Sequence, residues 1–200
     1  LVPPTAEPGG REHRVVFAGR HEPRKGLHVL LRAWPEIRRR TNLRLTVAGA
    51  DPLAVRLLLT RLRVPDDGID VVGLLSQDVL TDTLLTAKAL VAPSIGQESF
   101  GMVLTRGFAC ALPAVASDIP GYREVVTPDV ADAVAPNDPD ALADAITALV
   151  ENDARRERMG AAARALAVDR YSWSTIARRL EQVYAEVTGI AADDADARAA

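Results

Sequence analysis

Short apolar runs alternate with longer helical patterns along most of this chain, and that alternation restricts the fold more than any other feature. Strands are expected at 14–19, 43–48, 69–72, 89–92, 114–116 and 131–134. Helical periodicity is expected at 26–40, 52–62, 77–86, 100–110, 139–151, 153–168 and 175–187. Strands that alternate with helices in this way form a parallel sheet with helices on both faces. The prediction is therefore an α/β fold with three layers, α/β/α.

Three segments differ in composition. Residues 1–13, rich in Pro and Gly, are expected to form a linker or lead-in, residues 14–189 the folded domain, and residues 190–200 a disordered acidic tail. Pro35 is expected to kink or split the first helix. Because the chain starts with Leu1 rather than Met, we expect it to be a fragment of a longer protein.

The bulk composition excludes several classes of protein. The chain has 200 residues, of which 48% are hydrophobic, enough for one domain with a real core. A net charge of −3 argues against general nucleic-acid binding, and no apolar run is long enough for a membrane span. Cys110 is the only cysteine, which fits a reducing cytoplasm, and we expect it to be a small core residue.

The loops that follow strands are the first candidates for a ligand site, because ligands of such folds bind beyond the carboxyl ends of the strands. The loop 19–26 carries three cations, Arg20, Arg24 and Lys25, between two glycines. Lysine occurs at only one other position, Lys88. Cations in this place suit a phosphate or diphosphate, although an exposed loop with incidental charges explains them equally well.

A second loop, 93–101, brings a carboxylate to the same edge of the predicted sheet. Glu98 or Ser99 is a candidate cap for the following helix, whose first amides would otherwise be available to a ligand. Together the two loops offer cations, amides and a carboxylate, and that combination suits a sugar diphosphate.

Three motifs resemble a known family. They are Gly19-Arg20-x-x-x-x-Lys25-Gly26, Pro93-Ser94 followed by Glu98-Ser99-Phe100-Gly101, and Leu112-Pro113-x-Val115-Ala116-Ser117-Asp118-x-x-Gly121-x-x-Glu124. From about Val15 to Val187 the chain resembles the C-terminal, donor-binding half of retaining glycosyltransferases of group 1, which have the GT-B fold. The loop Glu22–Gly26 looks most like the actinobacterial phosphatidylinositol mannosyltransferases. The resemblance implies a Rossmann-like domain that is one half of a GT-B fold.

The resemblance also implies roles for particular residues. Arg20, Lys25 and Glu98 would be catalytic, with the two cations on the donor diphosphate and the carboxylate on the hydroxyls of the transferred sugar. Donor and nucleotide binding would involve Gly19, Gly49, Ala50, Asp51, Gly73, Leu74, Ser99, Phe100, Gly101, Met102 and Arg106.

The same resemblance sets expectations for ligands and partners. The enzyme would transfer a hexosyl group from a nucleoside diphosphate sugar, GDP-mannose or a UDP-sugar, without a cofactor or a metal in the site. No cluster with metal-ligand spacing is evident in the sequence. The partner would be a missing N-terminal acceptor-binding domain, and no nucleic acid is expected. A cytoplasmic location is expected, and the full-length enzyme is a candidate for peripheral association with the inner face of the membrane.

The sequence departs from the family pattern at several positions. Arg106 stands where the family has a second carboxylate that binds ribose hydroxyls, and a guanidinium only donates hydrogen bonds. Ala111 and Lys88 replace a family glycine and aspartate. Two hypotheses follow: an active enzyme with altered donor recognition, or a weakened or inactive relative that acts as a ligand- or partner-binding module.

Other classes of protein are also considered. A nicotinamide-dependent oxidoreductase would need a Gly-x-Gly-x-x-Gly turn, whose spacing the loop 19–26 lacks. A non-enzymatic partner-binding domain fits the arginine-rich segment 32–40. His21 is expected to be an exposed loop residue rather than a general base. Trp34 and Trp173 are expected to pack rather than to stack on sugars.

Overall fold

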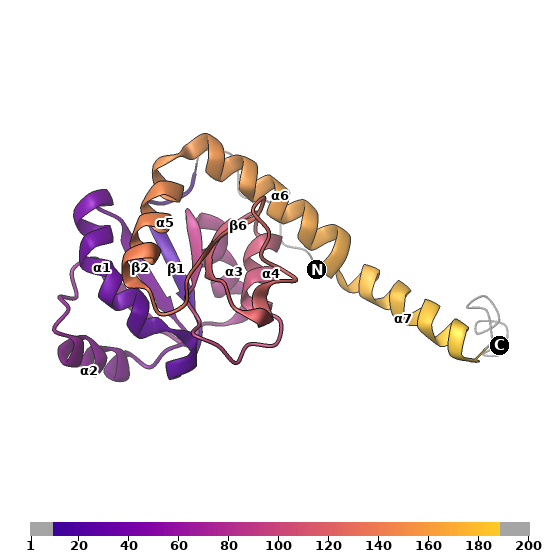
Figure 1. Ribbon diagram of the computed structural model, residues 1–200, viewed down its shortest axis with the longest axis horizontal. Helices are drawn as coiled ribbons and strands as arrows, with labels where there is room; N and C mark the ends of the chain where they lie inside the picture. Colours follow the sequence, from indigo (N-terminus) through magenta and orange to yellow (C-terminus); the bar gives the residue numbers. More distant parts are fainter. Residues whose placement is uncertain (1–9, 189–200) are drawn as a thin grey trace.

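The computed structural model describes residues 10–188, and its centre is a six-stranded, fully parallel sheet (Figure 1). The strands are β1 (Arg14–Ala18), β2 (Arg44–Ala48), β3 (Ile69–Gly73), β4 (Ala89–Ala92), β5 (Ala114–Ser117) and β6 (Ala131–Val134). Their order across the sheet is β3-β2-β1-β4-β5-β6. The expected parallel α/β sheet is confirmed.

Helices cover both faces of the sheet (Figure 1). One face carries α1 (Leu27–Thr41), α2 (Pro52–Leu62) and α5 (Pro139–Glu151). The other carries α3 (Gln77–Thr86), α4 (Met102–Ala109) and α6 (Asp153–Tyr171). The last helix, α7 (Trp173–Thr188), continues from α6 and projects away from the body of the domain. None of the helices between residues 10 and 188 combines the length and apolar content needed to cross a membrane.

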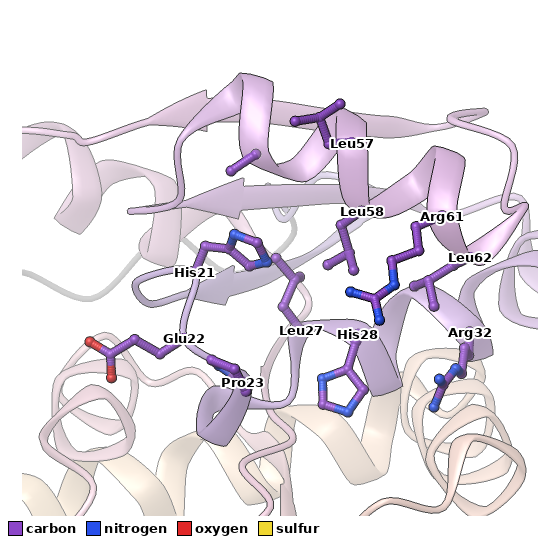
Figure 2. Close-up of a pocket in the computed structure, with 11 residues that line it drawn as sticks. His21, Glu22, Pro23, Leu27, His28, Arg32, Leu57, Leu58, Arg61 and Leu62 are labelled. Atoms are coloured by element: carbon purple, nitrogen blue, oxygen red, sulfur yellow. The ribbon is translucent and has the colours of Figure 1, made fainter.

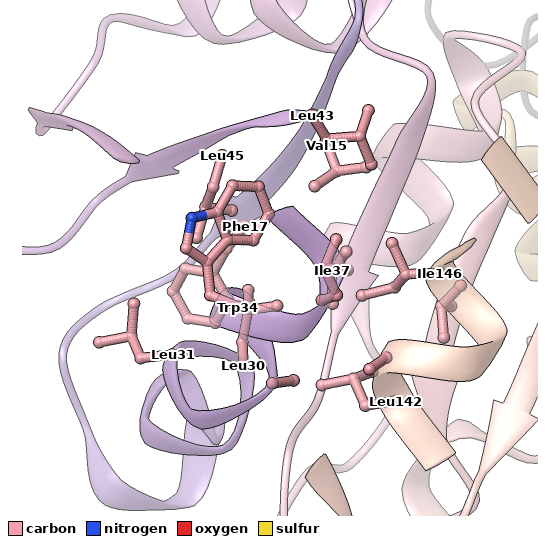
Figure 3. Packing of buried hydrophobic residues seen from close by; sticks show 14 of the residues in the cluster. Val15, Phe17, Leu30, Leu31, Trp34, Ile37, Leu43, Leu45, Leu142 and Ile146 are labelled. Carbon is pink, nitrogen blue, oxygen red and sulfur yellow. The ribbon is translucent and has the colours of Figure 1, made fainter. Parts of the chain in front are cut away.

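The side chains of each strand alternate between two core layers, as a sheet covered on both faces requires. In β1, Val15 and Phe17 belong to the layer under α1, whereas Val16 belongs to the layer on the opposite face. Figure 3 shows the first layer, in which Trp34 of α1 lies beside Phe17 and Leu45 of the sheet, and Ile37 lies toward Ile146 of α5. The indole nitrogen of Trp34 donates to the carbonyl of Asp67 at 2.9 Å, so its burial leaves no polar atom unpaired.

The fold confirms some expectations for single residues and overturns others. Helix α1 is not split at Pro35, which lies inside one continuous helix. Trp34 and Cys110 are buried, as expected. The expectation that Trp173 packs is wrong for the described chain, because its side chain is 80% exposed on the first turn of α7. The expected acidic tail and most of the expected lead-in lie outside the described residues.

Among the residues just before β1, Arg11 makes the most side-chain hydrogen bonds to the domain. The guanidinium of Arg11 donates to the carbonyls of Ala87 at 2.7 Å and Ala111 at 2.8 Å, and also to those of Leu85 and Cys110. These carbonyls follow the ends of α3 and α4, where backbone acceptors lack helical partners. Arg11 therefore joins the ends of two helices on the same face of the sheet.

Strand order determines where a crevice forms. From β1 the chain moves outward through β2 and β3, and then returns to place β4 on the other side of β1. The connections that leave β1 and β4 run to opposite faces, so their first loops diverge at the carboxyl edge of the sheet. This is the topological switch point, the usual ligand position in open α/β sheets.

Candidate functional site

The loops after β1 and β4 are in direct contact at the switch point. The amide of Ile95 donates to the carbonyl of Arg24 at 2.8 Å. Gly26 has a φ of +70°, and a Cβ at this position would lie 1.8 Å from the carbonyl oxygen of Pro93. Only glycine permits both this backbone conformation and this close approach. The spacing between the two loops is therefore fixed by backbone contact.

Glu98 is the centre of a cluster of charges at this junction. Its Oε1 lies 2.7 Å from Arg24 Nη1 and 2.7 Å from Lys25 Nζ, and its side chain is only 9% exposed. A carboxylate this well buried is costly to desolvate without opposite charges beside it, and the two cations offset that cost. The other oxygen, Oε2, accepts no hydrogen bond from residues 10–188. Glu98 thus keeps one acceptor atom for a ligand.

Arg24 connects this carboxylate to the rest of the first loop. Its guanidinium also donates to Glu22 Oε2 at 2.8 Å and to the carbonyl of Gln97 at 3.1 Å. Glu22 in turn pairs with Arg20 at 2.9 Å, and the side chain of Arg20 is 74% exposed. From the sequence, Arg24 is one of the cations of the loop, without an expected role in the site. The structure makes it the residue that ties Glu98 to the loop after β1.

The segment after β5 supports Glu98 from behind. A Cβ on Gly121 would lie 1.6 Å from the carbonyl oxygen of Glu98, so the two backbones touch. The hydroxyl of Tyr122 lies 2.8 Å from Ser94 Oγ, and Ser94 donates to Glu98 Oε1 at 3.4 Å. Burial raises the pKa of Tyr122 to about 12, so this hydroxyl stays protonated at neutral pH. Gly121, Tyr122 and Ser94 were missed as support residues, although two of them lie in the quoted motifs.

The segment between Glu98 and α4 leaves its amides available. In the described chain, the amides of Ser99, Phe100, Gly101 and Met102 donate no hydrogen bond. The cap of α4 is Gly101, with a φ of +85° and no side-chain cap, so the expectation that Glu98 or Ser99 caps this helix is wrong. Unpaired amides at a helix start suit an anion or a sugar oxygen.

The aromatic ring of Phe100 is not part of this open surface. It packs edge-to-face against Tyr171 of α6, with the ring centroids 5.4 Å apart. Its backbone amide donates no hydrogen bond within the described chain, and Met102 is 78% exposed.

The loops after β2 and β3 continue the same edge of the sheet. The amide of Gly49 donates to the carbonyl of Gly73 at 2.6 Å, and Gly19 donates to Ala48 at 2.9 Å. Leu74 is 90% exposed, which leaves it open to a ligand. The side chain of Ala50, in contrast, is buried, and that of Asp51 caps α2 through the amide of Ala54. Any contribution of Ala50 and Asp51 must therefore come mainly from their backbone.

Arg106 lies apart from the charge cluster. Its Nη2 donates to the carbonyl of Gln77 at 2.9 Å and to Thr81 Oγ1 at 3.3 Å, both in α3. No hydrogen bond or ion pair joins it to Glu98, Arg24 or Lys25 in the described structure. The residue in the position of the expected second carboxylate is therefore held against the neighbouring helix.

No group of three or more His, Cys, Asp or Glu side chains within residues 10–188 is arranged to hold a metal ion. The carboxylate of the candidate site is instead surrounded by basic side chains, an arrangement typical of sites that bind anions.

The fold, with these loops at its switch point, defines a doubly wound, Rossmann-like α/β domain. Residues 12–152 match the model of the family described as glycosyl transferases group 1. The chain belongs to this family.

Relatives with curated names agree with this assignment. A phosphatidyl-myo-inositol mannosyltransferase of Mycobacterium tuberculosis is 37% identical over 187 residues, which cover 88% of this chain and 47% of the relative. A D-inositol 3-phosphate glycosyltransferase of Xylanimonas cellulosilytica is 36% identical over 179 residues, covering 87% of this chain and 42% of the relative. The chain thus spans about half the length of the curated relatives it matches.

Solved structures show the same architecture. The HepE protein of Anabaena in complex with UDP and glucose matches 88% of this chain with a TM-score of 0.76 and 21% identity, over 48% of its own length. Sucrose-phosphate synthase of Thermosynechococcus elongatus matches 89% of this chain with a TM-score of 0.78 and 26% identity, over 46% of its length. The expected Rossmann-like half of a GT-B fold is confirmed.

Proposed function

We propose that this chain is the donor-binding half of a retaining, metal-independent glycosyltransferase that transfers a hexosyl group from a nucleoside diphosphate sugar. The observation that carries the proposal is the position of Glu98, which lies at the switch point with Arg24 and Lys25 on one oxygen and no hydrogen bond on the other. A second, acceptor-binding half supplies the rest of the site. A protein of two halves agrees with the finding that this chain covers only 47% and 42% of the length of the two relatives.

The proposed roles of the residues follow from the negative charge that develops on the leaving group. Cleavage of the bond between the sugar and the diphosphate leaves negative charge on the departing nucleoside diphosphate, and fixed cations stabilise that charge. Arg20, exposed at the edge of the crevice, and Lys25, beside Glu98, are the residues we assign to this task. Glu98 accepts hydrogen bonds from sugar hydroxyls through Oε2, while the amides from Ser99 to Met102 bind sugar or phosphate oxygens.

The free site is held together by its own ion pairs, and this has a consequence for binding. Lys25 contacts Glu98 in the structure, so a donor phosphate must compete for a cation that already has a partner. When the diphosphate takes Lys25, Arg24 still neutralises Glu98. The carboxylate therefore stays charged and oriented throughout the exchange, which makes Arg24 a positioning residue for Glu98.

The names of the relatives suggest particular substrates. Mannosyl transfer to phosphatidyl-myo-inositol, as in the mycobacterial relative, points to GDP-mannose as donor and an inositol phospholipid as acceptor. Glycosyl transfer to an inositol phosphate, as in the Xylanimonas relative, is the second candidate. We propose a cytoplasmic enzyme, and the lipid acceptor would place it at the inner face of the membrane.

Calorimetry with the purified chain tests the donor site. We expect GDP or UDP to bind with a dissociation constant in the micromolar to millimolar range, and Lys25→Met to weaken binding about tenfold or more. Arg56→Gln, an exposed substitution on α2 away from the site, serves as the matched control and should change nothing. Absence of heat with GDP, UDP and their sugars at millimolar concentration would contradict the proposal.

The second candidate is a catalytically weakened relative that still binds the nucleotide, and the placement of Arg106 favours considering it. The guanidinium sits at α3 in place of an acceptor for ribose hydroxyls. The two candidates differ in one measurement: sugar transfer by the longer protein that contains both halves. Nucleotide binding without turnover of any nucleotide sugar would select the weakened relative.

A further inference from the structure

A cavity lies in the groove between α1 and α2 (Figure 2). Glu98, Arg24 and Lys25 of the candidate donor site do not line it. Its volume is about 550 Å³, within the range of roughly 300–1,000 Å³ typical of small-molecule sites. It opens on the face of the sheet that α1 and α2 cover, behind the loop that carries Arg20 and Lys25.

One part of the cavity wall is apolar. The apolar lining residues are Pro23, Leu27, Ala54, Leu57, Leu58 and Leu62. Leu57 is 63% exposed and lies two residues from each of the buried Val55 and Leu59, on another side of α2. An exposed leucine is unremarkable alone, but here it borders a concave surface with other leucines. This wall suits a ligand with an apolar chain.

Four of the polar lining residues are basic: His21, His28, Arg32 and Arg61. His28 and Arg32 lie one turn apart on α1, and Figure 2 shows Arg61 of α2 reaching toward His28, while His21 lies at the end nearest the β1 loop. Neither Arg32 nor Arg61 forms an ion pair or side-chain hydrogen bond with any residue from 10 to 188. The guanidinium groups of Arg32 and Arg61 are therefore available to a ligand.

No carboxylate compensates these cations. The only acidic lining residue, Glu22, points away in Figure 2 and is bound to Arg20 and Arg24. Helix α2 contains no Asp or Glu, and the single acid of α1, Glu36, is bound to Arg39 and Arg40. Burial and the nearby Arg32 and His21 lower the pKa of His28, as expected where positive charges converge.

We infer that the groove between α1 and α2 is a binding site for an amphiphilic phosphate ester, with the phosphate on Arg32, Arg61 and His28 and the apolar chain along the leucines of α2. Guanidinium groups bind phosphate oxygens through paired hydrogen bonds, which an uncharged head group cannot reproduce. An inorganic phosphate, in turn, leaves the apolar wall exposed to water. The site therefore requires both parts of the ligand.

The test uses n-octyl phosphate as the probe, at concentrations where it is monomeric, with calorimetric detection. We expect it to bind the wild-type chain at least tenfold more tightly than inorganic phosphate or the uncharged n-octyl glucoside. Equal affinity for octyl phosphate and either comparison compound, or no binding at millimolar concentration, would overturn the inference.

Two pairs of variants locate the binding. Arg61→Gln should weaken octyl phosphate binding about tenfold, whereas Arg56→Gln on the same helix but outside the cavity should not. Leu57→Asp should weaken it similarly by placing a negative charge on the apolar wall, whereas Leu53→Asp, 65% exposed and also outside the cavity, should not. Equal effects within either pair would contradict the assigned position.

A final variant separates this site from the donor site. Arg20→Gln removes a cation from the loop after β1 but from no part of the groove, so octyl phosphate binding should persist. Loss of binding in Arg20→Gln would show that the probe occupies the donor crevice instead. This outcome is independent of whether GDP or UDP binds, so failure of one proposal leaves the other intact.

Discussion

Glu98 and Arg106 lie eight positions apart, one before α4 and one within it. They differ in how many elements of the fold contact their side chains and backbone. Glu98 is anchored by side chains from the loop after β1 and by backbone from the segment after β5. Arg106 makes two hydrogen bonds, both to a single neighbouring helix. A position held from several elements tolerates little change, whereas one held from a single helix can be replaced at small cost. The difference explains how a residue of opposite charge can occupy the second position within an intact fold.

The largest expected effect comes from breaking the backbone contact behind Glu98. Gly121→Ala would place a Cβ 1.6 Å from the Glu98 carbonyl, which forces the two segments apart. We expect a loss of about 3 kcal/mol in the free energy of unfolding and weaker nucleotide binding. Urea denaturation and calorimetry measure the two effects. Gly96→Ala, where no heavy atom lies within 4 Å, is the control and should cost about 1 kcal/mol through backbone strain alone.

Neutralising Glu98 itself should have the next largest effect. Glu98→Gln leaves Arg24 and Lys25 without their shared carboxylate, and because these cations are 29% and 21% exposed we expect a loss of about 1–2 kcal/mol. Lys25 is then free for phosphate, so a nucleoside diphosphate should bind as tightly as before or more tightly. Asp118→Asn, which breaks the exposed pair with Arg123, should cost less than about 0.5 kcal/mol. Weaker diphosphate binding in Glu98→Gln would contradict the assignment of Lys25.

Reversing the charge at position 106 should lower the free energy of unfolding less than the substitutions of Gly121 and Glu98 above, and it should strengthen nucleotide binding. Arg106→Glu loses the hydrogen bonds to Gln77 and Thr81, for an expected cost of about 1 kcal/mol. It restores an acceptor for ribose hydroxyls, so we expect GDP or UDP to bind several-fold more tightly. Arg106→Gln, which removes the cation without adding a carboxylate, is the control for loss of charge. If Arg106→Glu weakens binding, Arg106 is itself a ligand of the nucleotide.

The smallest effect at neutral pH concerns the thiol at the end of α4. Burial raises the pKa of Cys110 to about 11, against an ordinary value of 9.0, with Arg106 among the cations that oppose the rise. The folded state therefore keeps its proton where the unfolded state loses it, so this contribution to stability is complete below pH 9 and declines as the pH rises toward 11. Comparing wild type with Cys110→Ala between pH 8 and pH 11 measures the decline. A difference between the two that is constant with pH would contradict it.

The sequence predicted the secondary structure closely because each element has an unambiguous pattern. The apolar runs at 89–92 and 114–116 are fully buried strands, and the stripe of α1 faces the core as its spacing indicates. Pro35 does not split its helix, which continues through it. The expectation for Trp173 was wrong because nothing in the sequence around it indicates that, within residues 10–188, no surface covers its side chain.

The sequence predicted only part of the candidate site, because some of its contacts join segments that are far apart along the chain. Lys25 and Glu98 were predicted as site residues because each lies in a local motif. The roles of Arg24, Gly121 and Tyr122 depend on contacts between loops that are distant in sequence, which a pattern along the chain does not reveal. Likewise, the groove between α1 and α2 combines residues from two helices and a loop that carry no shared motif.

Arg11 has a practical consequence for anyone who trims this protein. Its guanidinium donates to five carbonyls at the ends of α3 and α4. A chain cut just before Arg14 would begin at the first strand but would lose this link between the two helices. Such a shortened protein should still contain every residue of the donor crevice. Protease cleavage would nevertheless be expected to begin near residues 85–87 and 110–111, where backbone acceptors would be left to water.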